Sequence, residues 1–277
     1  MPEGPEIRRA ADRLAAAVAG QTVLRAQFAF AQLQRFEREL VGSRILSITP
    51  RGKALLTAFD NGWTLYTHNQ LYGVWKVARP GQRPDTTRSL RVALETASAA
   101  ILLYSASDIE LWRSDEIEAH PFLQGLGPDV LDPALNADAD AVAARLQSLA
   151  FRGRALGALL LDQGFLAGMG NYLRAEVLFD TGLHPALRPR DLDAAQTAKL
   201  ARALLAIPRH SYTTRGIEPT PGMRADYLAH EGERFRFRVF KREGQPCERC
   251  GTPITRIASQ SRPLFLCPHC QPGRPSQ

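Results

Sequence analysis

The chain opens with apolar residues at helical spacing. Ile7, Ala10, Ala11, Leu14, Ala15 and Val18 recur three and four positions apart, which places their side chains on one face of a helix. Pro5 suits the first turn of such a helix, and Gly20 suits its C-terminal end. We therefore predict a helix over residues 3–19.

Between residues 22 and 104 the pattern changes to short apolar or alternating runs, which are typical of β-strands. Turn sequences such as Asp60-Asn61-Gly62 and Arg79-Pro80-Gly81 separate them. The expected strands cover residues 44–49, 54–59, 63–66, 73–77, 90–94 and 101–104. So many closely spaced strands predict a β-sandwich.

After Asp108 the apolar spacing becomes helical again. The expected helices cover residues 138–149, 154–161, 171–179 and 192–207. The proline- and glycine-containing segment from Pro121 to Asp132 is a candidate linker. We predict an α+β multidomain fold with a helix and β-sandwich over residues 1–120, a helical domain over 121–230, and a basic, cysteine-containing region over 231–277.

All four cysteines lie near the C-terminus. Cys247 and Cys250 form one C-x-x-C pair, sixteen residues separate it from the next, and Cys267 and Cys270 form the second. This spacing predicts a zinc ribbon in which four thiolates hold one structural Zn²⁺. Four protein ligands leave no open position for metal catalysis, and an iron–sulfur cluster or disulfides are the alternatives.

The net charge of +7 favours a polyanionic partner such as nucleic acid, although a solvated basic surface is the alternative reading. Arg234, Arg236 and Arg238 alternate with Phe235, Phe237 and Val239. A strand here would have one basic and one apolar face, and a charged edge strand is the alternative. Strands over 255–257 and 263–266 would place Arg262 near a hairpin tip, where it reaches outward.

No stretch of the sequence approaches the ~18 apolar residues of a membrane helix, and the acidic N-terminus is unlike a signal peptide. We therefore expect a cytoplasmic protein.

The N-terminus offers a nucleophile. If Met1 is removed, Pro2 presents a secondary amine, which condenses with an aldehyde carbon to give a cationic iminium that accepts electrons. An α-amino pKa of roughly 8 leaves part of such an amine unprotonated. Glu3 adjoins it and is a candidate for proton transfer. The simpler alternative is that these residues only begin a helix.

Five features together resemble the formamidopyrimidine-DNA glycosylase and endonuclease VIII family. They are MPEGPEIRRAADRL at 1–14, RGKALL at 51–56, THNQLYGVW at 67–75, GFLAGMGNYLRAEVL at 164–178 and the cysteine pairs. The resemblance implies a helix and β-sandwich, then a helix–two-turn–helix domain and a zinc finger. It also implies a monomer that acts on damaged double-stranded DNA at the nucleoid.

The resemblance implies the catalytic roles. Pro2 would attack C1′ of a damaged nucleotide, and Glu3 would act as general acid or base. Glu6 would be a supporting carboxylate, and Lys53 would bind phosphate and transfer protons. β-Elimination would follow from the iminium, and Arg262 would assist the second, δ-elimination.

The resemblance also implies DNA contacts. Gln70, Leu71 and Tyr72 would fill the space left by an extruded nucleotide, whereas the alternative buries the last two in a loop core. Asn171 and the backbone amides at the start of its helix would hold a phosphate. Gly125 stands where the family leads us to expect an arginine after Gln124, so one DNA contact is in doubt.

The resemblance leaves three functional readings. The first is a glycosylase and lyase for oxidised pyrimidines, favoured by the Gly4-Pro5-Glu6 opening, the Gln70–Tyr72 wedge and the short stretch between Ser211 and Arg234. The second is the sister enzyme for oxidised purines. The third is a DNA-binding protein without catalysis, which would have no need of an N-terminal secondary amine.

Overall fold

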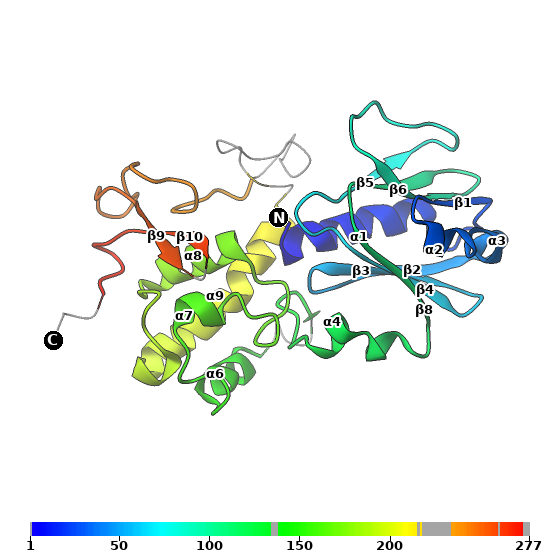
Figure 1. Cartoon of the computed structure of the whole chain (residues 1–277). Helices are drawn as coiled ribbons and strands as arrows, with labels where there is room; N and C mark the ends of the chain where they lie inside the picture. Colours follow the sequence, from blue (N-terminus) through cyan, green and yellow to red (C-terminus); the bar gives the residue numbers. More distant parts are fainter. Residues whose placement is uncertain (1, 134–137, 215–216, 218–233, 260, 274–277) are drawn as a thin grey trace. The chain divides into compact units, whose positions relative to one another are not determined.

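The computed structural model describes residues 2–133, 138–214, 217, 234–259 and 261–273 (Figure 1). These residues form two compact units. The first contains Pro2 and residues 6–124, and the second contains Glu3–Pro5 together with the chain from Gly125 onward. The chain therefore passes between the units both after its first residues and at Gln124.

The first unit contains two four-stranded antiparallel sheets. In spatial order, one has β1 (Arg25–Phe28), β6 (Leu90–Glu95), β7 (Ala100–Tyr104) and β5 (Val74–Ala78), and the other has β2 (Ile45–Arg51), β3 (Ala54–Phe59), β4 (Trp63–His68) and β8 (Asp108–Arg113). Helix α1 (Gly4–Val18) buries Ile7, Ala11, Leu14 and Val18 in the core that both sheets share. The predicted first helix and β-sandwich are confirmed.

Two strands of the sandwich were not predicted. The last predicted strand ended at residue 104, but the sandwich continues beyond it, because β8 pairs along its whole length with β4. Only Ile109 of β8 is buried, so this edge strand lacks a clear apolar alternation. Strand β1 has four residues, which is too short for its alternation to stand out. The short helices α2 (Ala31–Gln34) and α3 (Glu37–Leu40) were also missed.

The chain leaves the first unit across the second sheet. After β8 it forms the 3-10 helix η1 (Ile117–Ala119) and helix α4 (Pro121–Gln124). His120 stacks on Tyr66 of β4 with 4.0 Å between ring centroids, and Phe122 meets His68 edge-on at 5.2 Å. These ring contacts hold the first part of the predicted 121–132 linker on the sheet.

The second unit is mainly helical. Its elements are α6 (Ala139–Gln147), α7 (Leu156–Leu159), α8 (Asn171–Thr181), η2 (Pro189–Asp191), α9 (Ala194–Thr213) and a hairpin of β9 (Thr255–Ser259) and β10 (Arg262–Leu266). Helix α8 is buried on nearly all sides, and it packs against α9 and β10. One core contains Leu173 and Val177 of α8 as well as Leu264 and Cys267 of the ribbon. The predicted helices and hairpin are confirmed, with shorter α6 and α7.

The division into domains at 120/121 and 230/231 stays a prediction, and its second boundary lies outside the described residues. Among the helices that the structure describes, none is both long and apolar enough to cross a membrane.

Candidate active site and zinc site

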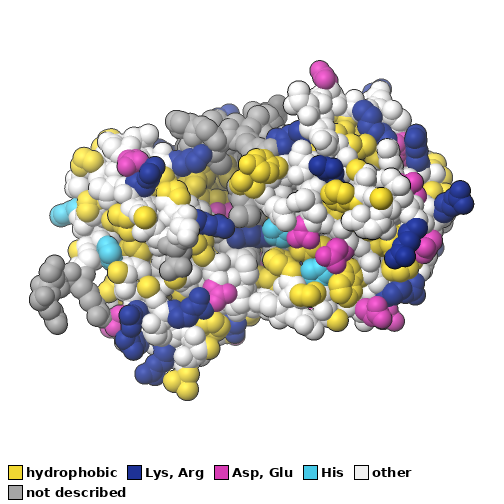
Figure 2. Space-filling model, in the orientation of Figure 1, with side chains coloured by type: hydrophobic (Ala, Val, Ile, Leu, Met, Phe, Trp, Pro, Cys, Tyr) yellow, Lys and Arg dark blue, Asp and Glu magenta, His cyan; other side chains and the backbone are white. Residues whose placement is uncertain are grey.

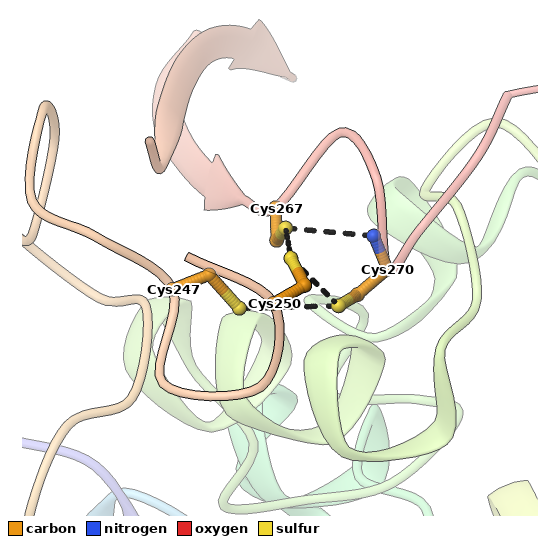
Figure 3. Close-up of side chains that lie close together, drawn as sticks. All are labelled: Cys247, Cys250, Cys267 and Cys270. Carbon is orange, nitrogen blue, oxygen red and sulfur yellow. Dashed lines mark hydrogen bonds between the residues drawn. The ribbon is translucent and has the colours of Figure 1, made fainter. Parts of the chain in front are cut away.

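The four cysteine sulfurs converge at the end of the second unit (Figure 3). All four Sγ atoms lie within 4.8 Å of one another, with Cys247–Cys270 at 3.9 Å and Cys250–Cys267 and Cys250–Cys270 at 3.5 Å. A tetrahedron of sulfurs about 2.3 Å from zinc has edges of about 3.8 Å. None of the cysteines is in a disulfide. The donor set therefore fits one structural Zn²⁺, as predicted, and the disulfide alternative is wrong.

In each C-x-x-C turn a backbone N–H donates a hydrogen bond to the first cysteine sulfur. The Arg249 N–H donates to Cys247 Sγ and the Cys270 N–H donates to Cys267 Sγ, each at 3.4 Å. Such donors stabilise a thiolate, the form in which cysteine binds metal. The sequence between the pairs forms the β9–β10 hairpin, so a bound metal would hold its base closed.

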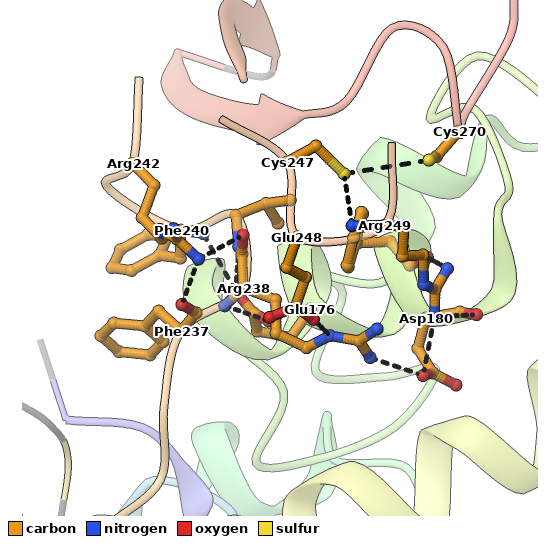
Figure 4. A network of polar contacts seen from close by, with 12 residues as sticks. Glu176, Asp180, Phe237, Arg238, Phe240, Arg242, Cys247, Glu248, Arg249 and Cys270 are labelled. Atoms are coloured by element: carbon orange, nitrogen blue, oxygen red, sulfur yellow. Dashed lines mark hydrogen bonds and ion pairs between the residues drawn. The ribbon is translucent and has the colours of Figure 1, made fainter. Parts of the chain in front are cut away.

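A buried carboxylate anchors the ribbon to the helices (Figure 4). Glu176 of α8 is 2% exposed, and its two oxygens accept from the backbone N–H groups of Arg238, Val239 and Phe240 at 3.0, 3.1 and 2.9 Å. Burial raises the pKa of Glu176, and the three amide donors oppose that rise. The segment before the cysteines is thus tied to α8 by its backbone.

The predicted basic strand at 234–239 is wrong. Phe235, Phe237 and Val239 are buried as expected, but the only described pairing in this segment is an isolated bridge at Phe235. The Arg238 guanidinium donates to Asp180 at 2.8 Å and pairs with Glu248 (Figure 4). It also lies 4.7 Å from the centroid of the Phe179 ring. The backbone amides of residues 238–240 donate to Glu176 instead of to a neighbouring strand, and Asp180 and Glu248 neutralise the charge of Arg238.

Basic side chains do not mark a binding surface by themselves. On the face shown in Figure 2, Lys and Arg side chains are scattered among Asp and Glu side chains on both units. On this face the basic side chains therefore form no continuous patch.

Glu3 is held at the start of α8. Its Oε1 accepts from the Tyr172 N–H at 2.8 Å, and its Oε2 accepts from the Leu173 N–H at 3.2 Å. The neighbouring Gly4 N–H donates to the Gly168 carbonyl at 2.8 Å. A carboxylate suits a helix N-terminus, because unpaired amides and the helix dipole both favour negative charge there.

This contact corrects one expectation and explains a glycine. The amides of Tyr172 and Leu173 were expected to hold a phosphate, but they bind Glu3. A Cβ at Gly170 would lie 2.2 Å from the Glu3 Cδ atom, although its extended backbone would accept any residue. Gly170 is therefore required by the close approach of Glu3.

Asn171 and Arg262 lie on neighbouring elements of the second unit. The Asn171 Nδ2 donates to the Pro263 carbonyl of β10 at 2.9 Å, and Arg262 is the exposed first residue of that strand, paired with Ser259. Asn171 thus contacts the backbone of the residue that follows Arg262. Its role in phosphate binding stays a prediction.

Lys53 occupies a tight turn of the first unit. Gly52 and Lys53 connect β2 to β3, and Gly52 has a φ of +59°, a conformation that glycine adopts without strain. Lys53 is buried. Burial and the nearby Lys53 charge lower the pKa of His68 to about 4, so His68 is neutral at pH 7.

Pro2 and Glu6 complete the predicted set at the N-terminus. Pro2 is buried, and Met1 lies outside the described residues. Glu6 is also buried, and it pairs with Arg9 at 2.8 Å one turn along α1.

The predicted wedge forms an exposed loop between β4 and β5. Leu71 and Tyr72 are 49% and 62% exposed, so the alternative that places them in a loop core is wrong. Gln70 has a φ of +47°, its N–H donates to His68 Nδ1 at 3.0 Å, and its Oε1 accepts from Ser107 Oγ at 2.6 Å.

Three residues that support these positions were missed from the sequence. Ser107 contacts Gln70, Arg88 donates to the Tyr72 carbonyl at 2.9 Å, and Arg174 contacts Asn171 at 2.5 Å. Arg174 lies inside the NYLRAEVL motif, which was its only signal in the sequence.

Comparison with known proteins decides the family. Residues 1–107 match the formamidopyrimidine-DNA glycosylase N-terminal domain, residues 126–218 its H2TH domain, and residues 244–273 the zinc finger found in FPG and IleRS. The Endonuclease 8 proteins of Shigella sonnei and Salmonella schwarzengrund are 54% and 55% identical over 271 residues, covering 98% of this chain and 100% of each relative. The chain belongs to the formamidopyrimidine-DNA glycosylase and endonuclease 8 family.

Solved structures of this family share the fold. The wild-type Lactococcus lactis Fpg in complex with DNA containing N7-benzyl-Fapy-dG has a TM-score of 0.82 at 21% identity, covering 98% of this chain and 100% of that one. The complex of Lactococcus lactis Fpg with abasic-site DNA has the same TM-score and coverage at 20% identity. Family membership extends over both units and the ribbon. The roles predicted for individual site residues are not decided by it.

Proposed function

We propose that this protein is a base-excision repair enzyme that removes oxidised pyrimidines, such as thymine glycol, from double-stranded DNA and then cleaves the strand. The similarity to Endonuclease 8 proteins over nearly the whole chain carries this proposal. The sequence Pro2-Glu3, with the carboxylate held against α8, supports it chemically.

In the proposed reaction the Pro2 nitrogen attacks C1′ of the damaged nucleotide. A C–N bond forms, the bond from C1′ to the base breaks, and the base leaves with that electron pair and a proton. Cleavage of the C1′–O4′ bond, with a proton passing to O4′, gives an iminium between Pro2 and C1′. Glu3 follows Pro2 in the sequence, and hydrogen bonds from the backbone N–H groups of Tyr172 and Leu173 hold its carboxylate, which would move these protons.

The iminium makes the C2′ proton acidic. Loss of that proton with departure of the 3′ phosphate is the β-elimination, and a further elimination releases the 5′ phosphate. Water then hydrolyses the iminium, which frees Pro2 and releases the unsaturated sugar aldehyde. Lys53, Asn171 and Arg262 would bind the phosphates, and Arg262 would assist the second elimination.

Extrusion of the nucleotide would leave a gap in the duplex. The exposed apolar side chains of Leu71 and Tyr72 would fill this gap. Bound Zn²⁺ would support the hairpin that carries Arg262 and would take no part in the chemistry. We propose a monomer in the cytoplasm, associated with the nucleoid through DNA. Size-exclusion chromatography with light scattering tests the oligomeric state.

Borohydride trapping tests the nucleophile. Incubation with a thymine-glycol duplex should attach DNA covalently to the wild-type protein, and Pro2→Gly should lose the adduct because its N-terminal primary amine lacks the proline geometry. Trapping by Pro2→Gly at the full rate would contradict the assignment. Intact mass must first show that Met1 is absent, because a retained Met1 predicts an inactive sample.

The sister activity on oxidised purines is the second candidate. Cleavage rates on thymine-glycol and 8-oxoguanine duplexes separate the two, and a clear preference for 8-oxoguanine would overturn the proposed subclass. The stretch between Ser211 and Arg234, used above to favour pyrimidines, lies almost entirely outside the described residues. Gly125 is exposed and has no side chain to contact DNA, so Gly125→Arg should tighten binding if the family contact is missing.

A further inference from the structure

Arg174 of α8 is a buried cation that the proposed reaction does not use. It is 0% exposed and is among the largest fully buried side chains of the described chain. Burying a guanidinium costs free energy unless its donors are all paired, yet no hydrogen-bond partner for its Nε lies within the described residues. An apolar side chain would fill this space at lower cost, so stability alone does not account for the arginine.

Its donors connect three elements of the second unit. Nη1 donates to the Gly157 carbonyl of α7 at 2.7 Å and approaches Ser259 Oγ of β9 at 3.4 Å. Nη2 donates to Asn171 Oδ1 at 2.5 Å. Ser259 is the residue that pairs with Arg262 across the hairpin, so Arg174 lies behind both predicted phosphate-binding residues of this unit.

The contact with Asn171 fixes the direction of its amide. Because Oδ1 accepts from Arg174, Nδ2 must face the hairpin, where it donates to the Pro263 carbonyl at 2.9 Å. An amide turned by 180° would present its oxygen there, and an oxygen repels a phosphate. A cation on the oxygen also strengthens the opposite N–H groups as donors.

The charges of Glu3 and Arg262 both affect the pKa of Arg174. Burial and the nearby Arg262 lower the pKa of Arg174, and Glu3 opposes this, leaving it at about 10. Arg174 is therefore cationic at neutral pH, and it adds positive charge beside the hairpin that carries Arg262.

We propose that Arg174 is a positioning residue that orients the Asn171 amide and seats the β9–β10 hairpin for binding a DNA phosphate. This inference rests on the proposed function, since it assumes that Asn171 and Arg262 meet DNA. Arg174 itself touches no substrate.

The test measures binding without cleavage, using a duplex that contains a tetrahydrofuran abasic-site analogue. Arg174→Met should weaken binding about tenfold, the equivalent of one charge-assisted hydrogen bond. If Arg262 is also misplaced, the slope of log Kd against log salt should fall by about 0.9, the value for one phosphate contact. Arg145→Met is the matched control, because Arg145 donates to the carbonyls of Gly164 and Phe165 and lies over the Phe151 ring, and none of these is a predicted DNA-binding residue.

A double variant separates positioning from general support. If Arg174 acts through Asn171, then adding Arg174→Met to Asn171→Ala should raise the Kd only slightly further. If the two residues act independently, their separate increases in Kd should multiply. The side-chain amide signals of Asn171, identified by their loss in Asn171→Ala, should shift in Arg174→Met. Fully multiplicative effects, or binding by Arg174→Met equal to that of Arg145→Met, would overturn the proposal.

Arg174→Lys covers the case in which the methionine variant does not fold. Lysine keeps the charge but cannot bridge Gly157 and Asn171 together, so binding should weaken severalfold while zinc content and melting temperature stay at wild-type values. Wild-type affinity in this variant would overturn the proposal. Wild-type protein that binds the analogue duplex without cleaving damaged DNA would contradict the proposed function. The binding affinities of the Arg174 variants would still test the role of Arg174 in that case.

Discussion

Replacing Glu3 by glutamine should destabilise the second unit as well as impair the reaction. A glutamine oxygen can accept from one of the amides of Tyr172 and Leu173, but its NH₂ group then faces the other. Losing a bond to a charged acceptor and leaving a buried donor unpaired costs roughly 1.5–3 kcal/mol. Loss of the negative charge at the helix N-terminus adds up to about 1 kcal/mol, for a total of roughly 2–4 kcal/mol.

This cost is measurable by calorimetry of the zinc-bound protein. For a unit of this size each kcal/mol lowers the melting temperature by roughly 2–4 °C, so Glu3→Gln should lower it by about 5–15 °C. Glu118→Gln is the control, because the exposed ion pair of Glu118 with Arg51 should contribute less than about 1 kcal/mol. Activity of the Glu3 variant must be measured below its transition.

Gly170→Ala tests the same contact from the other side. The backbone of Gly170 is extended, so alanine brings no backbone strain, but its Cβ would lie 2.2 Å from Glu3 Cδ and displace that side chain. The variant should lose stability and DNA cleavage like a Glu3 variant. In a Glu3→Ala background Gly170→Ala should cost little further stability, because the three atoms nearest to the new Cβ all belong to the Glu3 side chain. Wild-type stability and activity in Gly170→Ala alone would refute the reasoning.

Four further outcomes are expected. Chelation of zinc, or Cys250→Ser, should abolish DNA binding and cleavage together, and unchanged cleavage after verified zinc loss would contradict this coupling. His68 has a pKa of about 4 in the folded protein, against an ordinary 6.5. Its neutral form therefore contributes fully to the free energy of unfolding above pH 6.5. As the pH falls from 6.5 toward 4, the free energy of unfolding should decrease by at most about 3 kcal/mol. His68→Gln should therefore flatten the melting temperature against pH over that range, and an unchanged profile would disprove it. Arg262→Ala should keep the fold and zinc but accumulate the β-elimination product on sequencing gels, whereas a normal share of the δ-product would argue against its role. Arg88→Met removes the bond to the Tyr72 carbonyl, so discrimination between opposite bases should weaken while trapping persists; equal discrimination would show that the wedge does not need this bond.

The regular elements of the fold could be predicted where one face is apolar. Helix α1 buries one face, and its bounds were predicted to within one residue at each end. Strand β3 is buried at five of its six positions, and its continuous apolar run gave its bounds instead. Strand β8 was missed because it lies at a sheet edge and buries only Ile109. The segment 234–239 was assigned to a strand because its side chains alternate, but its amides bind Glu176. Alternation fixes which side chains are buried without fixing where the backbone amides point.

The sequence predicts those parts of the site in which side-chain atoms bind the metal or react, but not those in which backbone amides make the contacts. Cysteine spacing was sufficient for the zinc site, because the ligand atoms belong to the spaced residues themselves. The partners of Glu3 are backbone amides 169 and 170 positions away, and a backbone amide has no residue type to signal it. Arg174 was missed for a related reason, since an arginine in an amphipathic sequence is ordinarily placed at the surface.

The assignment of Glu3–Pro5 to the second unit has a consequence for dissecting the protein. A fragment starting at Gly125 would contain every helix of that unit, but the amides of Tyr172 and Leu173 would have no carboxylate to receive them. The second unit is therefore non-contiguous in sequence, and a split version of this protein would need its first residues supplied as a separate peptide.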